Sequence, residues 1–502
     1  MNFMKSAILI DQKKIHAVGK THEFIFFFAK LSTIMLIVLC IFASAPHSSL
    51  TFVACLWALA LIPFVFFRFS IFEPIAIYLT AFLTAFTVKP LMNDYLSSTG
   101  DGYLFALSGN ESLYKLGFPY AALFVLIHVY LVHIIYYWIT SNKRQQLFSG
   151  IRDSRFQSKD PTEKEYKRWK KTGMIGIIIY LPAFMYFIVF IQGLNFSEYA
   201  SNRNELLRGQ GLTWLLATFG TPLSIIYIYL ALMKSKIKNS RKLHILVALL
   251  CVISGQVIAP GRGNILSILL AFIIIYWWKK GEVQLKRLFA IGIVFIIFSF
   301  AVLQAREGQT QFNNESAVFF IVQDMGMFDY FVIYTGQMLS ENLDLSYGAQ
   351  LLRNLYVFLP RFIFPTKPIY YSTLEIQDAN KLIPLESSQV SFTPFVEWLY
   401  NFGIPGIFIG SILLALTLAA FFRLLAKRGS DIRIIVYVLF LPAFVIGYIK
   451  GGFSLAFMFF LLSPAWLAVM IYFGVRYLRL FNSTVHYQGV KKSESISINS
   501  DK

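Results

Sequence analysis

The interval Gln304–Gly403 is the one long stretch of this chain without a clean membrane span, and it closes with Glu397-Trp398-Leu399-Tyr400-Asn401-Phe402-Gly403. Apolar blocks of roughly 17–25 residues lie on both sides of it, and a helix of that length crosses the hydrocarbon core of a bilayer. Inside the interval, Arg353–Tyr371 is rich in proline and aromatic residues, which predicts a stiff and ordered loop. We therefore expect a hydrophobic scaffold that holds one large loop on one side of a membrane.

The composition of the 502-residue chain is that of a membrane protein. It is 57% hydrophobic and 17% aromatic, whereas a soluble domain is usually about half apolar or less. In lipid every backbone polar group must be bonded internally, and the alternating ten-residue strands of a barrel are absent, so we expect the spans to be helices. The predicted fold class is an all-α polytopic membrane protein.

The formal net charge of +19 has a topological explanation, and nucleic acid is not an expected partner. Lys and Arg gather between alternate spans, most densely in Lys143–Lys171, and such segments stay in the cytoplasm. Most of the 45 Lys and Arg fall in cytoplasmic loops when the chain has about twelve spans and both termini inside. The predicted order is a cytoplasmic N-terminus (1–23), helices 1–9 (24–303), a large outer loop (304–401), helices 10–12 (402–475) and a cytoplasmic tail (476–502).

Two smaller features bear on the type of membrane protein. The centres of the spans are nearly free of charge, which argues against an ion-coupled transporter, and His128 and His133 are expected to serve helix packing. Within the loop, Ser316–Leu339 is apolar and aromatic but interrupted by Asp324 and Asp329. Two structures are open for it: an amphipathic helix lying at the membrane surface, or a further span.

Arginines lie just outside several different spans, on the side where the positive-inside bias disfavours them. They are Arg203, Arg208, Arg262, Arg306, Arg353 and Arg361. The planar guanidinium group binds two phosphate oxygens at once, and the adjacent glycines would allow backbone amides to approach a phosphate closely. Each arginine alone pairs as readily with a carboxylate or a lipid headgroup, but the set of six favours a polyanionic ligand.

Metal and cofactor chemistry has no motif in this sequence. The carboxylates of the loop lack metal-ligand spacing, and no phosphate loop, nucleophile elbow or dinucleotide fingerprint occurs. The three cysteines fall in apolar runs and indicate no disulfide. We expect no metal and no cofactor, with arginine as the charge stabiliser.

Four short motifs follow one another along the outer loop. They are Tyr347-Gly348, Leu359-Pro360-Arg361, Pro365-x-Lys367-Pro368 and Glu397-x-x-Tyr400-Asn401-Phe402-Gly403-x-x-Gly406. With the Gly261-Arg262-Gly263-Asn264 turn, and with Arg203 and Arg208-x-x-Gly211, this order resembles the Wzy-type O-antigen polymerases. The resemblance covers most of the chain in topology and these short motifs in sequence.

The resemblance implies a multi-pass glycosyltransferase of the bacterial inner membrane, with a periplasmic loop between helices 9 and 10. It would polymerise oligosaccharide repeat units linked to undecaprenyl diphosphate into O-antigen or a related surface polysaccharide. The expected partners are the lipid-linked glycan donor and acceptor and the membrane lipids, and a chain-length regulator is a further candidate.

This chemistry suggests a role for each candidate residue. A leaving diphosphate develops negative charge that fixed guanidinium groups stabilise, so Arg361 and Arg262 are catalytic candidates. Candidates for diphosphate binding are Arg203, Arg208, Arg306, Arg353 and Lys367. Glu397 is the first candidate for a general base, ahead of Asp324 and Glu205, although a structural hydrogen-bond role is equally open. Tyr400 and Asn401 are candidates for sugar contact, with a structural role as the alternative.

Two other functions are compatible with the same features. The first is a flippase or transporter of lipid-linked sugars. The second is an O-antigen ligase, but the resemblance implies that such ligases use a periplasmic histidine beside an arginine. The one histidine placed outside is His47, in a short turn far from the motifs, which disfavours the ligase.

Overall fold

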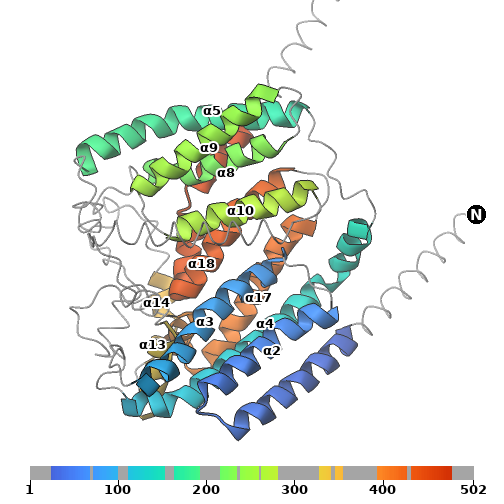
Figure 1. Ribbon diagram of the computed structural model, residues 1–502, viewed down its shortest axis with the longest axis vertical. Helices are drawn as coiled ribbons and strands as arrows, with labels where there is room; N and C mark the ends of the chain where they lie inside the picture. Colours follow the sequence, from blue (N-terminus) through green and yellow to red (C-terminus); the bar gives the residue numbers. More distant parts are fainter. Residues whose placement is uncertain are drawn as a thin grey trace, which may run out of the picture. The chain divides into compact units, whose positions relative to one another are not determined.

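The computed structural model describes residues 24–67, 72–99, 111–152, 163–192, 215–233, 238–258, 262–280, 327–340, 345–353, 393–426 and 431–477. All regular secondary structure in these ranges is helical (Figure 1). The chain divides into two compact units. Unit 1 comprises residues 1–153, 311–428 and 443–460, and unit 2 comprises residues 154–310, 429–442 and 461–502.

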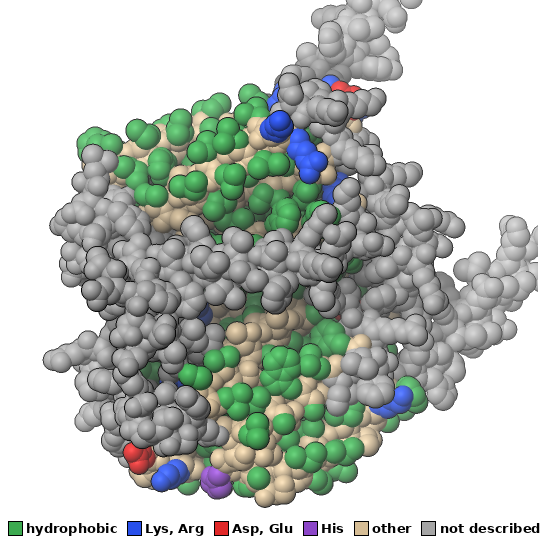
Figure 2. Space-filling model, in the orientation of Figure 1, with side chains coloured by type: hydrophobic (Ala, Val, Ile, Leu, Met, Phe, Trp, Pro, Cys, Tyr) green, Lys and Arg blue, Asp and Glu red, His purple; other side chains and the backbone are tan. Residues whose placement is uncertain are grey.

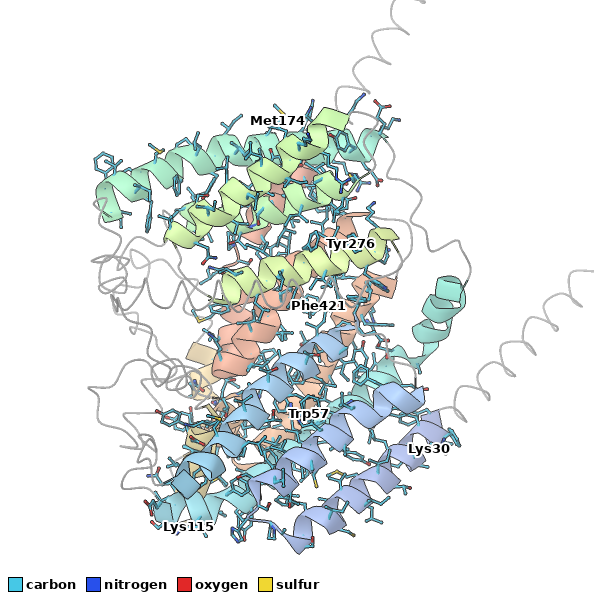
Figure 3. The ribbon with its side chains drawn as sticks, viewed as in Figure 1. Lys30, Trp57, Lys115, Met174, Tyr276 and Phe421 are labelled. Atoms are coloured by element: carbon cyan, nitrogen blue, oxygen red, sulfur yellow. The ribbon has the colours of Figure 1, made fainter. Side chains whose placement is uncertain are left out.

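Unit 1 contains the helix over 24–44 and the helices that surround the end of the predicted outer loop. These are α2 (Ser49–Phe67), α3 (Pro74–Thr99), α4 (Glu111–Arg152), α13 (Met327–Ser340), α14 (Ala349–Arg353), α16 (Pro394–Phe402) and α17 (Ile404–Ala426). The middle part of α18 (Asp431–Leu461) also belongs to this unit. Aromatic side chains pack between the helices; Phe421 of α17, for example, lies 5.8 Å from Phe444 of α18 between ring centroids (Figure 3).

Unit 2 contains α5 (Glu163–Tyr186) and the π-helical turn η2 (Phe187–Gln192), followed by α8 (Gly220–Leu232), α9 (Lys238–Ile258) and α10 (Arg262–Lys280). The helix α8 is the centre of this unit, because it packs against α5, α9 and α10. Gly173 and Gly176 of α5 allow that approach, since a Cβ atom on either would press on Tyr227 or Leu223 of α8.

Eight of the described helices are long and apolar enough to cross a membrane. Hydrophobic side chains cover most of the described surface in Figure 2. Lipid-facing helices are expected to expose such side chains. The protein is therefore a multi-pass membrane protein that is all-helical in its described residues, and the count of about twelve spans and their orientation stay predictions. The sequence also predicts a ninth span over Leu288–Leu303, which lies outside the described residues. Ser49–Leu61 and Asn264–Lys279 are shorter apolar helices.

The sequence predicts a third span over Ile71–Val88, a polar loop from Lys89 to Gly117 and a fourth span over Phe118–Ile139. The boundaries of these two spans are wrong. The polar loop expected from Lys89 to Gly117 is largely helical, because α3 continues to Thr99 and α4 already begins at Glu111. Neither Pro90 in α3 nor Pro119 in α4 ends its helix. Lys89, expected in a loop, instead lies inside unit 1.

The apolar first third of the predicted outer loop is helical where it is described. Helix α13 is described from Met327 to Ser340, and residues 316–326 of the same apolar stretch lie outside the described part. The helix packs against α3, α4 and α16, as Figure 1 shows for its position beside α3 and α4. Its residues 328, 329 and 331–335 are buried, so this part is not a helix lying free on the membrane surface, and a further span over Ser316–Leu339 stays a prediction.

The crossing of α4 and α13 depends on two glycines. A Cβ atom on Gly117 would overlap the carbonyl oxygen of Val332, and one on Gly336 would overlap the carbonyl oxygen of Leu113. Backbone atoms cannot move aside as a flexible side chain can. The two helices therefore touch backbone to backbone at this point.

We expect Gly117→Ala to lower the stability of the protein by about 1–3 kcal/mol or more, because the methyl group forces these backbones apart. Gly474→Ala is the matched control, since a Cβ atom there meets nothing within 4 Å and alanine favours a helix by up to ~1 kcal/mol over glycine. The measurement is the thermal midpoint of each purified variant in detergent. Equal midpoints for the two variants would contradict the tight crossing.

Candidate functional site

The short helix α16 carries the last of the four loop motifs and lies in the interior of unit 1. Thr393 caps its N-terminus by accepting a hydrogen bond from the amide of Val396, and Pro394 occupies the first turn, where a missing N–H costs nothing. Residues 394–401 are buried. Phe395 contacts aromatic rings of α3 and α13 and lies edge-on to His128 of α4, with 4.9 Å between ring centroids.

Glu397 closes a break in a membrane helix. In α18, Gly451 and Gly452 leave helical geometry, and Gly452 has φ 77°. The helix restarts at Phe453, and its first amides point at the Glu397 carboxylate: Phe453 N donates to Oε2 at 2.5 Å and Ser454 N donates to Oε1 at 3.0 Å. Glu397 thus serves as the N-cap of a half-helix that is 56 residues away in sequence.

Glycine is the only residue type that fits position 452, at the break in α18, without strain. The positive φ at this position favours glycine, and a Cβ atom would overlap Oε2 of Glu397. The sequence predicts that Lys450-Gly451-Gly452 joins two separate spans. In the structure the two helices follow directly on one another, and the carboxylate of α16 fills the gap between them.

Burial sets the protonation of Glu397. Glu397 is 2% exposed, and this burial raises the pKa of its carboxyl group to about 7. The hydrogen bonds from Ser454 and Phe453 lower the pKa and offset part of this effect. A carboxyl group with a pKa near neutrality can exchange a proton at physiological pH. The same group is also tied to two backbone amides.

The raised pKa of Glu397 predicts that stability falls as pH rises. The unfolded carboxyl loses its proton near the ordinary value of 4.5 and the folded one near 7, so between these values the folded state binds more protons. The stabilisation is full below pH 4.5 and is lost as pH rises to about 7, a change of up to ~3 kcal/mol.

The measurement is the thermal midpoint of the wild-type protein and of Glu397→Gln in detergent between pH 4 and 8. The difference between the two curves isolates this group from the other carboxylates. We expect the difference to change between pH 4.5 and 7 and to be flat above. A constant difference across the whole range would show that Glu397 does not titrate there.

The first and last motifs of the loop lie against each other. The amide of Ser346 donates to the carbonyl oxygen of Tyr400 at 2.9 Å, and Asn401 Nδ2 donates to Gln350 Oε1 at 2.6 Å. The chain reverses at Tyr347 and Gly348, both with positive φ, just before α14. The turn places α14, which ends at Arg353, directly on α16.

The glycines of the last motif permit the close crossing of α16 and α17. Gly403, with φ 62°, ends α16, and α17 begins at the next residue. A Cβ atom on Gly406 would overlap the carbonyl oxygen of Trp398, and one on Gly410 would enter the indole ring of the same residue. The pattern Tyr400-Asn401-Phe402-Gly403-x-x-Gly406 therefore has a packing explanation.

The structure describes three of the predicted site residues completely. Glu397, Tyr400 and Asn401 lie together on α16, and all three are buried. The Asn401 amide nitrogen is engaged by Gln350 and by the carbonyl oxygen of Glu397, which is the structural role left open for it. Sugar contact by Tyr400 and Asn401 stays a prediction.

The remaining site residues lie at the margins of the description or outside it. Arg262 is the first residue of α10 and Arg353 the last of α14, but their side chains are outside the described part. Outside the described residues altogether are Arg203, Glu205, Arg208, Arg306, Asp324, Arg361 and Lys367. The predicted convergence of arginines on one anionic ligand therefore stays a prediction.

Lys89 and Asp329 form a buried ion pair that the sequence did not predict. Lys89 of α3 and Asp329 of α13 lie 3.4 Å apart, with 5% and 1% of their side chains exposed. Sequence alone held a signal, because charges inside apolar segments are expensive and usually meet a partner of opposite sign. The pair fastens the helix of the outer loop to a membrane helix.

His128 has the packing role that the sequence indicates. Its Nδ1 lies 2.8 Å from Ser411 Oγ and its Nε2 lies 2.8 Å from Tyr78 Oη. Ser411 Oγ donates its proton to the carbonyl oxygen of Ile407, so it accepts from Nδ1–H, and Nε2 accepts from the tyrosine. A neutral histidine therefore joins three helices of unit 1, α3, α4 and α17.

Comparisons with family models, with curated proteins and with solved structures return no match. The function must therefore be argued from the residues and the geometry of unit 1.

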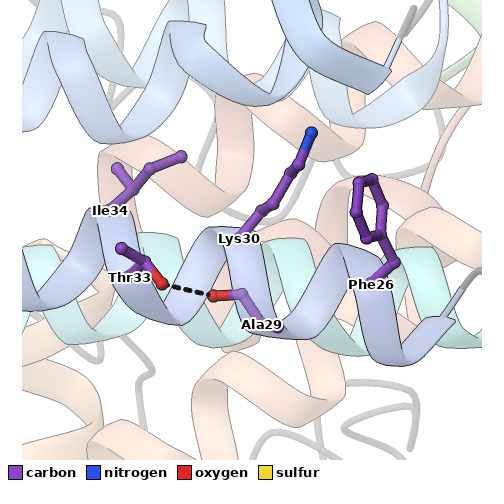
Figure 4. A pocket seen from close by; sticks show the side chains of 5 residues that line it. All are labelled: Phe26, Ala29, Lys30, Thr33 and Ile34. Carbon is purple, nitrogen blue, oxygen red and sulfur yellow. Dashed lines mark hydrogen bonds between the residues drawn. The ribbon is translucent and has the colours of Figure 1, made fainter.

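A pocket of about 380 Å³ on the first helix contains none of the predicted site residues. It is lined by Phe26, Ala29, Lys30, Thr33 and Ile34, all from one face of the helix (Figure 4). The Lys30 ammonium lies 4.2 Å from the centre of the Phe26 ring. A long basic side chain next to exposed apolar neighbours is typical of lysine that extends toward a membrane surface, so this pocket does not compete with the site around α16.

Proposed function

We propose that this protein is a membrane glycosyltransferase that polymerises oligosaccharide repeat units carried on undecaprenyl diphosphate, in the manner of the Wzy-type polymerases. The main support is that two loop motifs separated by about fifty residues pack as one body: Ser346 bonds Tyr400, and Gln350 bonds Asn401. The motifs are thus parts of a single folded site rather than points on a flexible loop. The family resemblance supplies the reaction.

In this proposal the site works by electrostatics and positioning. The transfer breaks the bond between the sugar and the diphosphate of the donor lipid, and the acceptor hydroxyl of the other repeat unit forms the new glycosidic bond. The hydroxyl proton goes to a base, and the lipid diphosphate leaves with the bond electrons. Arg361, Arg262 and the other outer basic residues would stabilise that charge.

Glu397 has a different role in this proposal from the base that the sequence favoured. Its carboxylate is bonded to the amides of Phe453 and Ser454, so it holds α16 against the break in α18. It therefore positions Tyr400 and the Arg353 end of α14 for the reaction. The identity of the base, among Glu397, Asp324 and Glu205, stays a prediction.

The decisive test of the polymerase is the surface polysaccharide of a strain that lacks this gene. The wild-type gene should restore the ladder of long chains, and Arg361→Ala, expressed at normal levels, should reduce polymer synthesis about 100-fold, as removal of one charge-stabilising donor does. Arg423→Ala is the matched control, because Arg423 is an exposed arginine in the last turn of α17. A full ladder with Arg361→Ala would remove Arg361 from the catalytic set.

A flippase of lipid-linked sugars is the second candidate, and one observation favours it. Broken membrane helices are common at the substrate sites of transporters, and α18 is broken at Gly451-Gly452. The two functions leave different products in the deletion strain. A lost flippase leaves repeat units on the cytoplasmic side, whereas a lost polymerase leaves single units at the cell surface. Purified protein that makes polymer from lipid-linked repeats alone would also separate the polymerase from a ligase.

A further inference from the structure

Three helix ends meet in unit 2 and form what we call the basic end. They are residues 163–171 of α5, 241–244 of α9 and 472–477 of a helix over 465–477 that follows α18. Trp169 stacks on Tyr472 with 4.3 Å between ring centroids, and Tyr166 meets His244 edge to face at 6.1 Å. Trp169 is 1% exposed. The aromatic rings thus form a solid floor that holds the three ends together.

Cations project from this floor. Besides Lys167, the exposed ones are Lys164, Lys170, Lys171, Arg241, Lys242 and Arg476. The carboxylates among the described residues of the basic end are Glu163 and Glu165. Glu163 is paired with Lys167 at 2.6 Å, and Glu165 lies close to Tyr472. Among the described residues of the basic end, positive side chains therefore outnumber the two carboxylates.

The cations lie close together in space as well as in sequence. Lys170 of α5 is near enough to His244 of α9 to interact with it electrostatically, and Arg168 and Arg476 both act on Tyr472. Figure 2 shows Lys and Arg side chains gathered where α5 and α9 end, next to the hydrophobic surface along these helices. Each of the three helices is long and apolar enough to cross a membrane.

These positions determine the kind of partner. The end of a membrane-spanning helix lies at the level of the lipid headgroups, where tyrosine and tryptophan are enriched. For lysine and arginine side chains at that level, the lipid phosphates are the nearest anions. Charge-assisted hydrogen bonds to phosphate are among the strongest that these side chains form. A soluble polyanion would require the cluster to stand clear of the bilayer, which helix ends do not.

We propose that the basic end is a binding site for the phosphate headgroups of anionic phospholipids. It contains none of the residues assigned to the proposed reaction, and it does not depend on that function. Lys170 and Lys171 of α5 and Arg241 of α9 would hold the headgroup from two helices. A bound lipid would therefore clamp α5 to α9, in addition to the packing of both on α8.

The test uses the full-length protein in detergent, titrated with phosphatidylglycerol or phosphatidylcholine and followed by native mass spectrometry. We expect saturable binding of phosphatidylglycerol that weakens with added salt. The triple variant Lys170→Gln, Lys171→Gln, Arg241→Gln should bind it at least 10-fold more weakly, since each cation near an anionic membrane contributes about fivefold. Phosphatidylcholine binding should be weak and unchanged.

Two controls keep the test decisive. Arg423→Gln removes an exposed arginine in unit 1 and should leave phosphatidylglycerol binding unchanged. The thermal midpoint of the triple variant without lipid should equal that of the wild type, which excludes a folding defect; if it does not, Lys171→Gln alone replaces it. Equal binding of the two lipids, equal loss in the Arg423 control, or full competition by inorganic phosphate would overturn the proposal.

Discussion

Replacing Asp329 by asparagine is expected to lower the free energy of unfolding by about 3–5 kcal/mol, because it removes the carboxylate from a buried ion pair and leaves the charge of Lys89 uncompensated. The two charged atoms are 3.4 Å apart, and both side chains are almost fully shielded from solvent. Taking a single charge out of water costs far more than a hydrogen bond returns. A loss is also expected for Lys89→Met, which removes the cation that faces the buried carboxylate.

The double variant separates charge from shape. Asp329→Asn with Lys89→Met removes both charges, so it should be less destabilised than either single variant, and a double-mutant cycle gives the coupling directly. The matched control is Glu163→Gln, which breaks the exposed pair with Lys167 in α5; its side chains are 79% and 57% exposed. That change should cost about 0.3–0.5 kcal/mol.

The measurement is unfolding in detergent by denaturant or heat for all four variants and the wild type. Additive losses in the double variant would mean that the two charges do not act on each other. A small decrease in the free energy of unfolding for Asp329→Asn, similar to that for Glu163→Gln, would mean that water solvates the ion pair. The aromatic contacts of α13 would then hold this helix in place alone.

The second large effect concerns Glu397. We expect Glu397→Ala to abolish polymer synthesis, because it leaves the buried amides of Phe453 and Ser454 without an acceptor at about 1–3 kcal/mol each and releases α16 from α18. Glu397→Gln should retain much of the activity, because the glutamine Oε1 still accepts from one of the amides. The measurement is the polysaccharide ladder in the deletion strain, at matched protein levels.

The comparison of these two variants distinguishes positioning from proton transfer. A general base loses its function in both variants, since neither alanine nor glutamine accepts a proton at neutral pH. Activity lost in a stable, normally expressed Glu397→Gln protein would therefore restore Glu397 as the base. Activity kept in Glu397→Ala would show that the link between α16 and α18 has no part in the reaction.

The sequence was sufficient for features that depend on local pattern. Apolar blocks long enough for a bilayer predicted helices, and the described chain is helical and multi-pass. The helix over 404–425 begins close to the predicted Phe402. Tyr347-Gly348 and Gly403 were singled out as motif residues, and both are sharp turns with positive φ. Such features are encoded in a few neighbouring residues, so they can be recognised without knowing the fold.

The sequence could not predict what the motifs contact. Glu397 and Phe453 are separated by 56 residues, and no local pattern indicates that a carboxylate of one helix caps another. The sequence also predicted a wrong end for the third span, before Lys89. A lysine at the end of an apolar run usually marks the membrane surface. Here the ion pair with Asp329 allows Lys89 to stay buried within α3. Asp329, the residue that makes this burial possible, is 240 positions away from Lys89 in the chain.

The sequence by itself identified 304–403 as a long segment without a clean span, because hydrocarbon excludes unpaired polar groups. It also placed the four motifs in this segment. Tertiary structure decided that its described parts are not an outer lobe. Helices α13 and α16 are buried among membrane helices of unit 1, joined to them by the Lys89–Asp329 pair and by the carboxylate of Glu397. Only the folded chain brings each buried charge to its partner, and burial without a partner would be too costly to persist.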